Sequence, residues 1–115
     1  MPHSWSSLGT DLEPFRVEVH PERDSARVVP IGEVDIATVG EIDARLRELN
    51  QAGSQHLVLD LRQLTFIDST GVRLVLTWHA AARQNGIDFT VLEGPPAVQR
   101  VFALAGVLDH LPFRT

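Results

Sequence analysis

Hydrophobic and polar side chains alternate with a period of two over residues 15–20, which predicts a half-exposed strand. A polar turn at residues 21–25 separates it from a second apolar run, residues 26–31, so we expect the two segments to form a hairpin. Because Pro30 has no N–H to donate, we expect it at an edge or a bulge of the sheet. Residues 56–61 are almost all apolar, as in a strand that is covered on both faces.

Three other segments show apolar residues at helical spacing. They cover residues 37–51, residues 69–84 and residues 95–105. The second of them runs into Asn-Gly, a typical helix end, and the third begins with proline, which suits a first turn. Two further strands are expected at residues 88–93 and 107–113.

The resulting order, ββαβαβαβ, predicts the α/β class. We expect a mostly parallel sheet of four to five strands that opens with an N-terminal β-hairpin and is packed by about three helices. A length of 115 residues fits one such domain. We assign the domain to residues 14–115, and we expect the aperiodic residues 1–13 to form a flexible arm.

Composition removes several classes of function. The net charge is −5 without any basic run, so we expect neither nucleic acid nor a membrane as a partner. Cysteine and lysine are both absent, which excludes thiol chemistry, a P-loop lysine and the lysine of a receiver domain. The histidines lack metal-ligand spacing, so no metal or cofactor is expected. Without a long apolar run or a signal-peptide pattern, the expected location is the cytoplasm.

One loop carries the strongest candidate for chemistry. Residues 66–72 read Phe-Ile-Asp-Ser-Thr-Gly-Val and join the buried strand to the second helix. Ser69 is expected at the N-terminus of that helix, where free N–H groups favour an anion such as phosphate. The carboxylate of Asp68 beside it suits a phosphorylation switch better than a permanent anion site. Taken alone, Ser69 or Asp68 could simply cap this helix, and Asp35 could cap the first one.

The neighbours of this loop also carry structural expectations. Gly71 lacks Cβ, so we expect it to let a partner approach the backbone closely. Phe66 and Ile67 are expected to anchor the loop from below. The second helix has more apolar residues than one buried stripe can hold, so part of them is expected to face a partner or a dimer mate. Trp78 is the candidate for that exposed part.

Four segments together resemble a known family. They are Gly-Glu-Val-Asp at residues 32–35, the buried strand at residues 57–61, the loop at residues 66–72, and the helix start at residues 95–102. Over about residues 15–113 the chain resembles a STAS domain, specifically the bacterial anti-sigma factor antagonists. An Asp-Ser-Thr-Gly sequence alone is a weak signal, and its place after a buried strand, downstream of Gly-Glu-Val-Asp, makes it a strong one.

The resemblance implies a regulator that is not an enzyme. In this family the unphosphorylated antagonist binds an anti-sigma factor that is also a serine kinase, and a sigma factor is released. The kinase then phosphorylates the antagonist, which ends binding, and a serine phosphatase resets the system. The implied phosphorylation site is Ser69, with Thr70 less favoured. The expected partner-binding residues are Asp35, Asp68, Ser69, Thr70, Gly71 and Arg73.

Three alternatives remain open at this stage. The chain could be a STAS scaffold subunit of a larger signalling assembly, in which self-association into a homodimer or larger particle dominates. It could be a nucleotide-binding STAS module that uses the helix N-terminus at Ser69 without covalent change. A subunit of a lipid-transport complex is a further possibility on family grounds.

Overall fold

The computed structural model describes residues 14–115, so the arm expected at residues 1–13 lies outside the described residues. Within the described range, one six-stranded sheet is accompanied by three α-helices and a short 3₁₀ helix. The strands are β1 (Arg16–Glu22), β2 (Ser25–Val34), β3 (His56–Asp60), β4 (Leu64–Ile67), β5 (Asp88–Leu92) and β6 (Phe113–Arg114). The helices are α2 (Val39–Gln51), α3 (Ser69–Asn85), α4 (Pro96–Leu104) and the 3₁₀ helix η1 (Leu108–His110).

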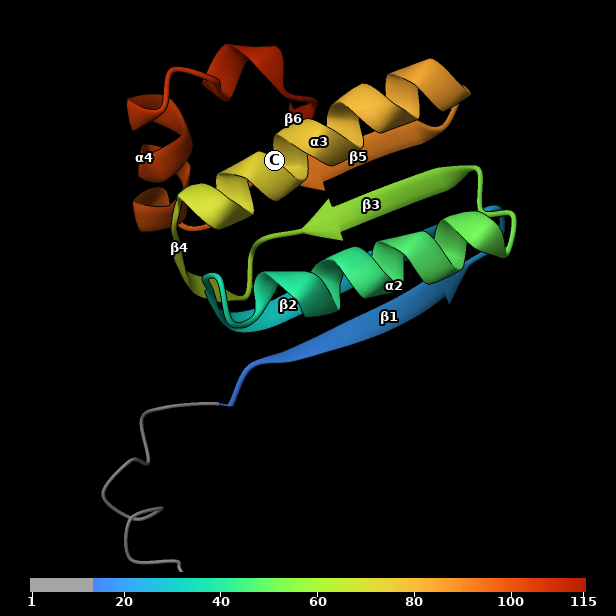
Figure 1. The fold of residues 1–115 in the computed structure, drawn as a ribbon, viewed down its shortest axis with the longest axis horizontal. Helices are drawn as coiled ribbons and strands as arrows, with labels where there is room; N and C mark the ends of the chain where they lie inside the picture. The colour runs from blue at the N-terminus through green and yellow to red at the C-terminus, as the bar shows by residue number, and fades with distance from the viewer. Residues whose placement is uncertain (1–13) are drawn as a thin grey trace, which may run out of the picture.

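The sheet is parallel apart from its opening hairpin (Figure 1). β1 pairs antiparallel with β2, and the order continues in parallel through β3, β5 and β6. β4 pairs in parallel with the last part of β2, beyond the stretch that pairs with β3. This arrangement confirms the predicted α/β class and N-terminal hairpin, with one strand more than the upper limit expected.

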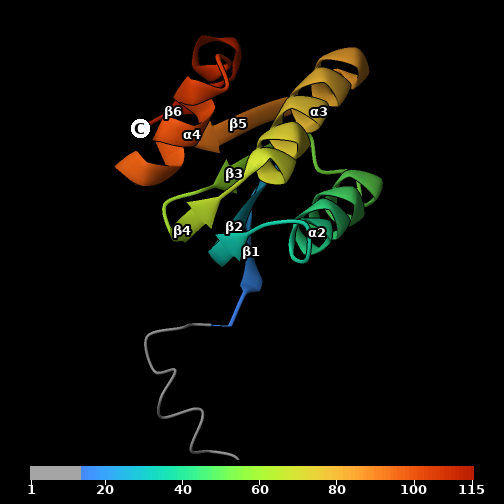
Figure 2. The ribbon, with the colours of Figure 1, turned by 60° about the vertical axis from the view of Figure 1, so that its left-hand side comes forward.

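Helices α2 and α3 lie side by side on one face of the sheet (Figures 1 and 2). Their apolar stripes pack against alternate residues of the central strands, because side chains in a strand point to opposite faces in turn. α4 packs against β4 and contributes Phe102, which is fully buried and stacks edge-on against Phe113. The core includes Val28, Ile42, Leu46, Leu57, Leu59, Val72, Val75, Val91 and Phe102.

The expected element order lacks one strand and places the last strand too early, since β6 covers Phe113–Arg114. Residues 64–67 form β4. β2 continues beyond its last pairing with β3, so its backbone N–H and C=O groups there are available to pair with another strand. Residues 107–113 do not form one strand. The chain reverses at Gly106, whose φ of 75° suits glycine, and the N–H of His110 then bonds to the carbonyl of Val107 to close η1.

Two residue-level expectations also need correction. Pro30 is buried in an interior strand and not at an edge. It lies between the part of β2 that pairs with β3 and the part that pairs with β4, so on that side its missing N–H removes no ladder bond. Trp78 is not exposed: only 8% of it is accessible, and its indole N–H donates to Asp43 Oδ1 over 2.8 Å. The polar edge of the indole needs a partner when buried, and α2 supplies it.

Candidate functional site

The site is assembled where β2 and β4 end side by side. Val34 pairs with Ile67 in the parallel register, and the N–H of Asp68 bonds to the carbonyl of Val34 over 3.2 Å. Asp35 and Asp68 therefore follow directly from neighbouring strand ends. The strand that brings them together is β4, which pairs with β2 beyond the stretch that pairs with β3.

Asp68 is the N-cap of α3. Its backbone is extended, and its Oδ1 accepts the N–H of Thr70 over 2.9 Å and the hydroxyl of Thr70 over 2.5 Å. The carbonyl of Asp68 accepts the next two N–H groups, from Gly71 and Val72, each over 3.1 Å. These bonds satisfy donors that a helix start leaves free, so the capping role considered for Asp68 is real and fixes the loop.

The same bonds keep the Asp68 carboxyl ionised. The hydroxyl of Thr70 is the main cause that lowers the pKa of Asp68 below its ordinary value. Desolvation by burial opposes it, and backbone N–H groups at the helix start lower the pKa further. Hydrogen bonds to the charged form favour that form. At neutral pH the residue before Ser69 thus carries a full negative charge.

The two hydroxyl residues of the loop differ in availability. Ser69 is exposed at the first position of α3, and among residues 14–115 no group holds its hydroxyl in a hydrogen bond. Thr70 is half-buried, and its hydroxyl is committed to Asp68. Because Asp68 caps the helix, Ser69 does not have the capping role that its position alone allowed. Its hydroxyl is free to react or to contact a partner.

Asp35 shapes the turn between β2 and α2. Its Oδ1 accepts the N–H of Ala37 over 2.9 Å, and its carbonyl accepts the N–H groups of Thr38 and Val39. The hydroxyl of Thr38 donates to the carbonyl of Glu33 over 2.9 Å and accepts the N–H of Asp35. The helix begins at Val39, and the N-cap position belongs to Thr38, so Asp35 stabilises the turn before the helix rather than its cap.

Gly71 serves packing and not external access. It is buried, and a Cβ added to it would lie 2.5 Å from Cγ1 of Ile67 and 2.9 Å from Cγ1 of Val34. The first turn of α3 can therefore lie against β2 and β4 only because this residue has no side chain. The expectation that Gly71 opens the backbone to a partner is wrong, because its open side faces the core.

The remaining residues of the loop divide between core and surface. Ile67 is buried, as expected for an anchor, whereas Phe66 is 45% exposed and so does not hold the loop from below. Arg73 is exposed on α3, one turn after Ser69, with no hydrogen bond or ion pair to any residue in 14–115. Ile36, next to Asp35, is 82% exposed. Sequence reasoning did not single out Ile36, although an isoleucine directly after a turn aspartate was the available signal.

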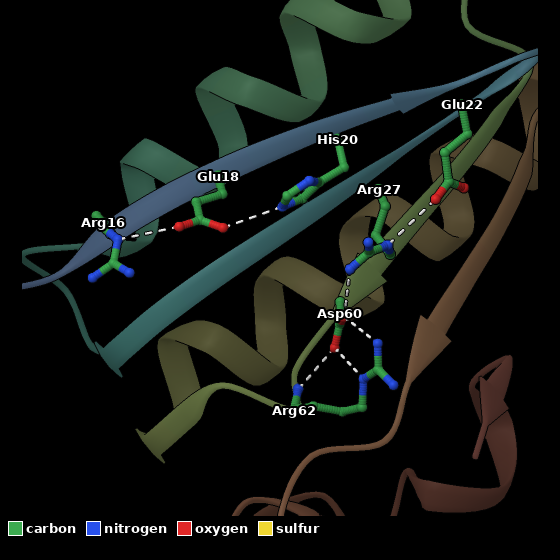
Figure 3. A network of polar contacts seen from close by, with 7 residues as sticks. All are labelled: Arg16, Glu18, His20, Glu22, Arg27, Asp60 and Arg62. Atoms are coloured by element: carbon green, nitrogen blue, oxygen red, sulfur yellow. Dashed lines mark hydrogen bonds and ion pairs between the residues drawn. The ribbon is translucent and has the colours of Figure 1, made fainter.

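A polar network lies on the sheet face opposite α2 and α3 (Figure 3). Asp60 ends β3, is only 2% exposed, and accepts hydrogen bonds from the backbone N, Nε and Nη2 of Arg62 and from Nη1 of Arg27. Burial alone would raise the pKa of Asp60, but the bonds and charge of Arg62, with help from Arg27, outweigh it and lower the pKa. The network fixes the turn that leads from β3 into β4.

The fold and the loop together define a class of protein, and comparison with known families agrees. A family model described as "Mlab, STAS domain" matches residues 19–112. The chain belongs to the STAS domain family, among the anti-sigma factor antagonists. In the part of the chain that is described, no helix is long and apolar enough to cross a bilayer, and no cluster of acidic and histidine side chains could hold a metal ion.

The named relatives are antagonists of anti-sigma factors. The chain is 30% identical over 78 residues to the anti-sigma-B factor antagonist of Staphylococcus aureus, covering 68% of this chain and 72% of the relative. It is similar to the structure of the anti-sigma factor antagonist SpoIIAA in its unphosphorylated form, with a TM-score of 0.69, 25% identity and 89% of each chain covered. An anti-sigma factor antagonist from Mycobacterium paratuberculosis shares the fold, with a TM-score of 0.73, 22% identity, and 87% and 85% of the two chains covered.

Proposed function

We propose that this protein is an anti-sigma factor antagonist controlled by phosphorylation of Ser69. The unphosphorylated form binds an anti-sigma factor with serine kinase activity and so releases a sigma factor. Phosphorylation of Ser69 by that kinase ends the binding, and a serine phosphatase restores it. The observation that carries the proposal is the exposed, unbonded hydroxyl of Ser69 beside an ionised Asp68 and a committed Thr70.

The fold itself tolerates the modification. Ser69 is exposed, and its hydroxyl makes no bond with residues 14–115 that phosphorylation would break. A phosphate there lies at the N-terminus of α3, where the helix dipole stabilises a negative charge by about 0.3–1 kcal/mol. The modification therefore acts on binding and leaves folding nearly unchanged.

The interface does not tolerate it. A phosphate adds about −1.5 to −2 charges at neutral pH. It would stand beside the Asp68 carboxylate, and in the kinase it would face the remaining phosphates of the nucleotide that supplied it. Like charges brought together in an interface cost several kcal/mol, which is roughly two or more decades in affinity. This cost exceeds the stabilisation by the helix dipole.

A pull-down with matched baits tests the proposal. Ser69→Ala, which cannot be phosphorylated, is expected to retain a serine-kinase anti-sigma factor from the lysate of the source organism, and Ser69→Asp is expected to lose it. Ser54→Asp is the control, because Ser54 follows α2 at the opposite end of the sheet and receives the same charge. Equal retention by both Ser69 variants, or retention of copies of the bait alone, would favour a scaffold function instead.

A further inference from the structure

Large apolar side chains are rarely exposed on this domain, and two of the four that are exposed lie at the end of the sheet where α3 begins. Within residues 14–115 the exposed large hydrophobics are Ile36 at 82%, Phe66 at 45%, Leu104 at 77% and Leu108 at 36%. Single exposed apolar residues need no explanation, but two at one site point to contact with another molecule.

Ile36 and Phe66 reach the site from two different strands. Ile36 follows Asp35 in the turn after β2, and Phe66 lies in β4 three residues before Ser69. β2 and β4 are adjacent and parallel there, with Glu33 paired to Phe66. β2 and β4 end side by side at the end of the sheet where α3 begins, so both residues lie at that end. Neither residue belongs to the core cluster, although Phe66 is partly covered.

We propose that Ile36 and Phe66 are the apolar anchors by which this protein holds its anti-sigma factor, an inference that rests on the proposed function. A stable protein interface buries about 800 Å² on each partner. A kinase that reaches the Ser69 hydroxyl with such an interface must also cover the side chains next to it. Exposed aromatic and aliphatic groups at the centre of an interface supply most of its affinity when they fill pockets on the partner.

The charges around the anchors select among the occupants of this surface. Glu33 is exposed beside Phe66, Asp35 adjoins Ile36, and Asp68 is ionised. A second copy of the chain docked through the same surface would bring the three carboxylates of each copy into one interface, because both sides of a two-fold interface use the same residues. The exposed Arg73 of each copy would offset only part of that repulsion. An anionic bilayer would be repelled in the same way. The fitting occupant is a partner protein with apolar pockets and without an acidic rim.

The anchors and Ser69 then have separate tasks. Burial of Ile36 and Phe66 holds the complex together and should set the dissociation rate. Unmodified Ser69 contributes little to the affinity, whereas phosphorylated Ser69 weakens the complex. Variants at the anchors should therefore weaken binding without preventing the phosphate from acting, and Ser69→Ala should leave binding intact.

Dissociation constants of purified variants test this inference. The probe is the serine-kinase anti-sigma factor of the source organism, purified with bound ADP and titrated against the full chain. Ile36→Ala and Phe66→Ala are each expected to weaken binding at least tenfold, mainly through faster dissociation. Both variants should still unfold cooperatively, and the melting temperature of Ile36→Ala should be unchanged. Leu104→Ala is the matched control, because Leu104 is as exposed as Ile36 but closes α4 at the end that leads away from β4 (Figures 1 and 2). It is expected to bind within twofold of wild type.

The outcomes separate this inference from the proposed function. If Ser69→Asp loses binding while both anchor variants bind like wild type, the anchors are wrong and the switch stands. If the anchor variants bind weakly while Ser69→Ala and Ser69→Asp bind equally, the switch is wrong and the anchors stand. If sedimentation shows that wild type is a dimer that Phe66→Ala dissociates, the surface holds a second copy and the inference is overturned. Absence of any binding by wild type and by Ser69→Ala overturns both.

Discussion

Replacement of Gly71 by alanine tests how tightly α3 must pack to place Ser69. The added Cβ would lie 2.5 and 2.7 Å from Cγ1 and Cδ1 of Ile67 and 2.9 Å from Cγ1 of Val34. Ordinary contacts between carbon atoms lie near 3.5–4.0 Å, so the helix and the strands must separate by roughly 1 Å. Both neighbours are buried and belong to the core, so neither can move into solvent.

The expected cost follows from two opposing effects. Overpacking of a core costs about 1–3 kcal/mol, and the gain in helix propensity from glycine to alanine returns up to about 1 kcal/mol. We expect Gly71→Ala to lower the free energy of unfolding by about 1–2 kcal/mol. Gly40→Ala is the matched control, because Gly40 is also in a helix but has nothing within 4 Å of the added Cβ. It should be neutral, or stabilising by about 0.4–1 kcal/mol.

Urea unfolding of both variants measures the difference directly. A shift of the midpoint without a change in slope reports a change in stability alone. The melting temperature of Gly71→Ala should fall by several degrees, as expected for a change of this size in a domain of this length. If Gly71→Ala is as stable as Gly40→Ala, Gly71 is not a packing residue and its place two residues after Ser69 needs another reason.

Three further changes have defined outcomes. Asp68→Ala removes the cap of α3 and should cost about 1 kcal/mol in urea unfolding. Because folding lowers the pKa of Asp60, the stabilisation by its carboxylate should be complete above about pH 4 and lost as the pH falls through the pKa of the folded state. Asp60→Asn should therefore be less stable at pH 7, and its free energy of unfolding should depend less on pH in the acid range. Trp78→Phe removes the bond to Asp43 and should cost about 1–3 kcal/mol by thermal unfolding, whereas equal stability would show that this bond adds nothing.

The sequence predicted the long elements well because their signals are long. α3 was expected from residue 69 to residue 84, and it covers Ser69–Asn85, with Gly86 in the left-handed conformation at its end. β4 was missed because it has four residues and no clean alternation: Leu64 and Ile67 are buried while Thr65 and Phe66 between them are exposed. β4 forms because it can pair with the last part of β2, and that pairing joins residues far apart in the sequence.

At the site, the residue types were predictable and their orientations were not. Asp68, Ser69 and Thr70 stood out in the sequence. The sequence could not tell which of the two hydroxyl groups bonds to Asp68, because that depends on the geometry of the helix start. Gly71 was misread because the sequence does not tell whether the missing side chain makes room for a partner or for the core. In the structure it makes room for Ile67 and Val34 of the core. Trp78 was misplaced because its partner Asp43 lies 35 positions away.

The most direct test of the central account compares one purified chain before and after phosphorylation. The chain is incubated with ATP and the serine-kinase anti-sigma factor that we propose as its partner. The modified residue is then located by mass spectrometry, and both forms are titrated against the kinase. The account predicts a single phosphate on Ser69 and binding at least about a hundredfold weaker afterwards, from the several kcal/mol of repulsion between like charges. A phosphate on Thr70 instead, or equal affinity of the two forms, would contradict it.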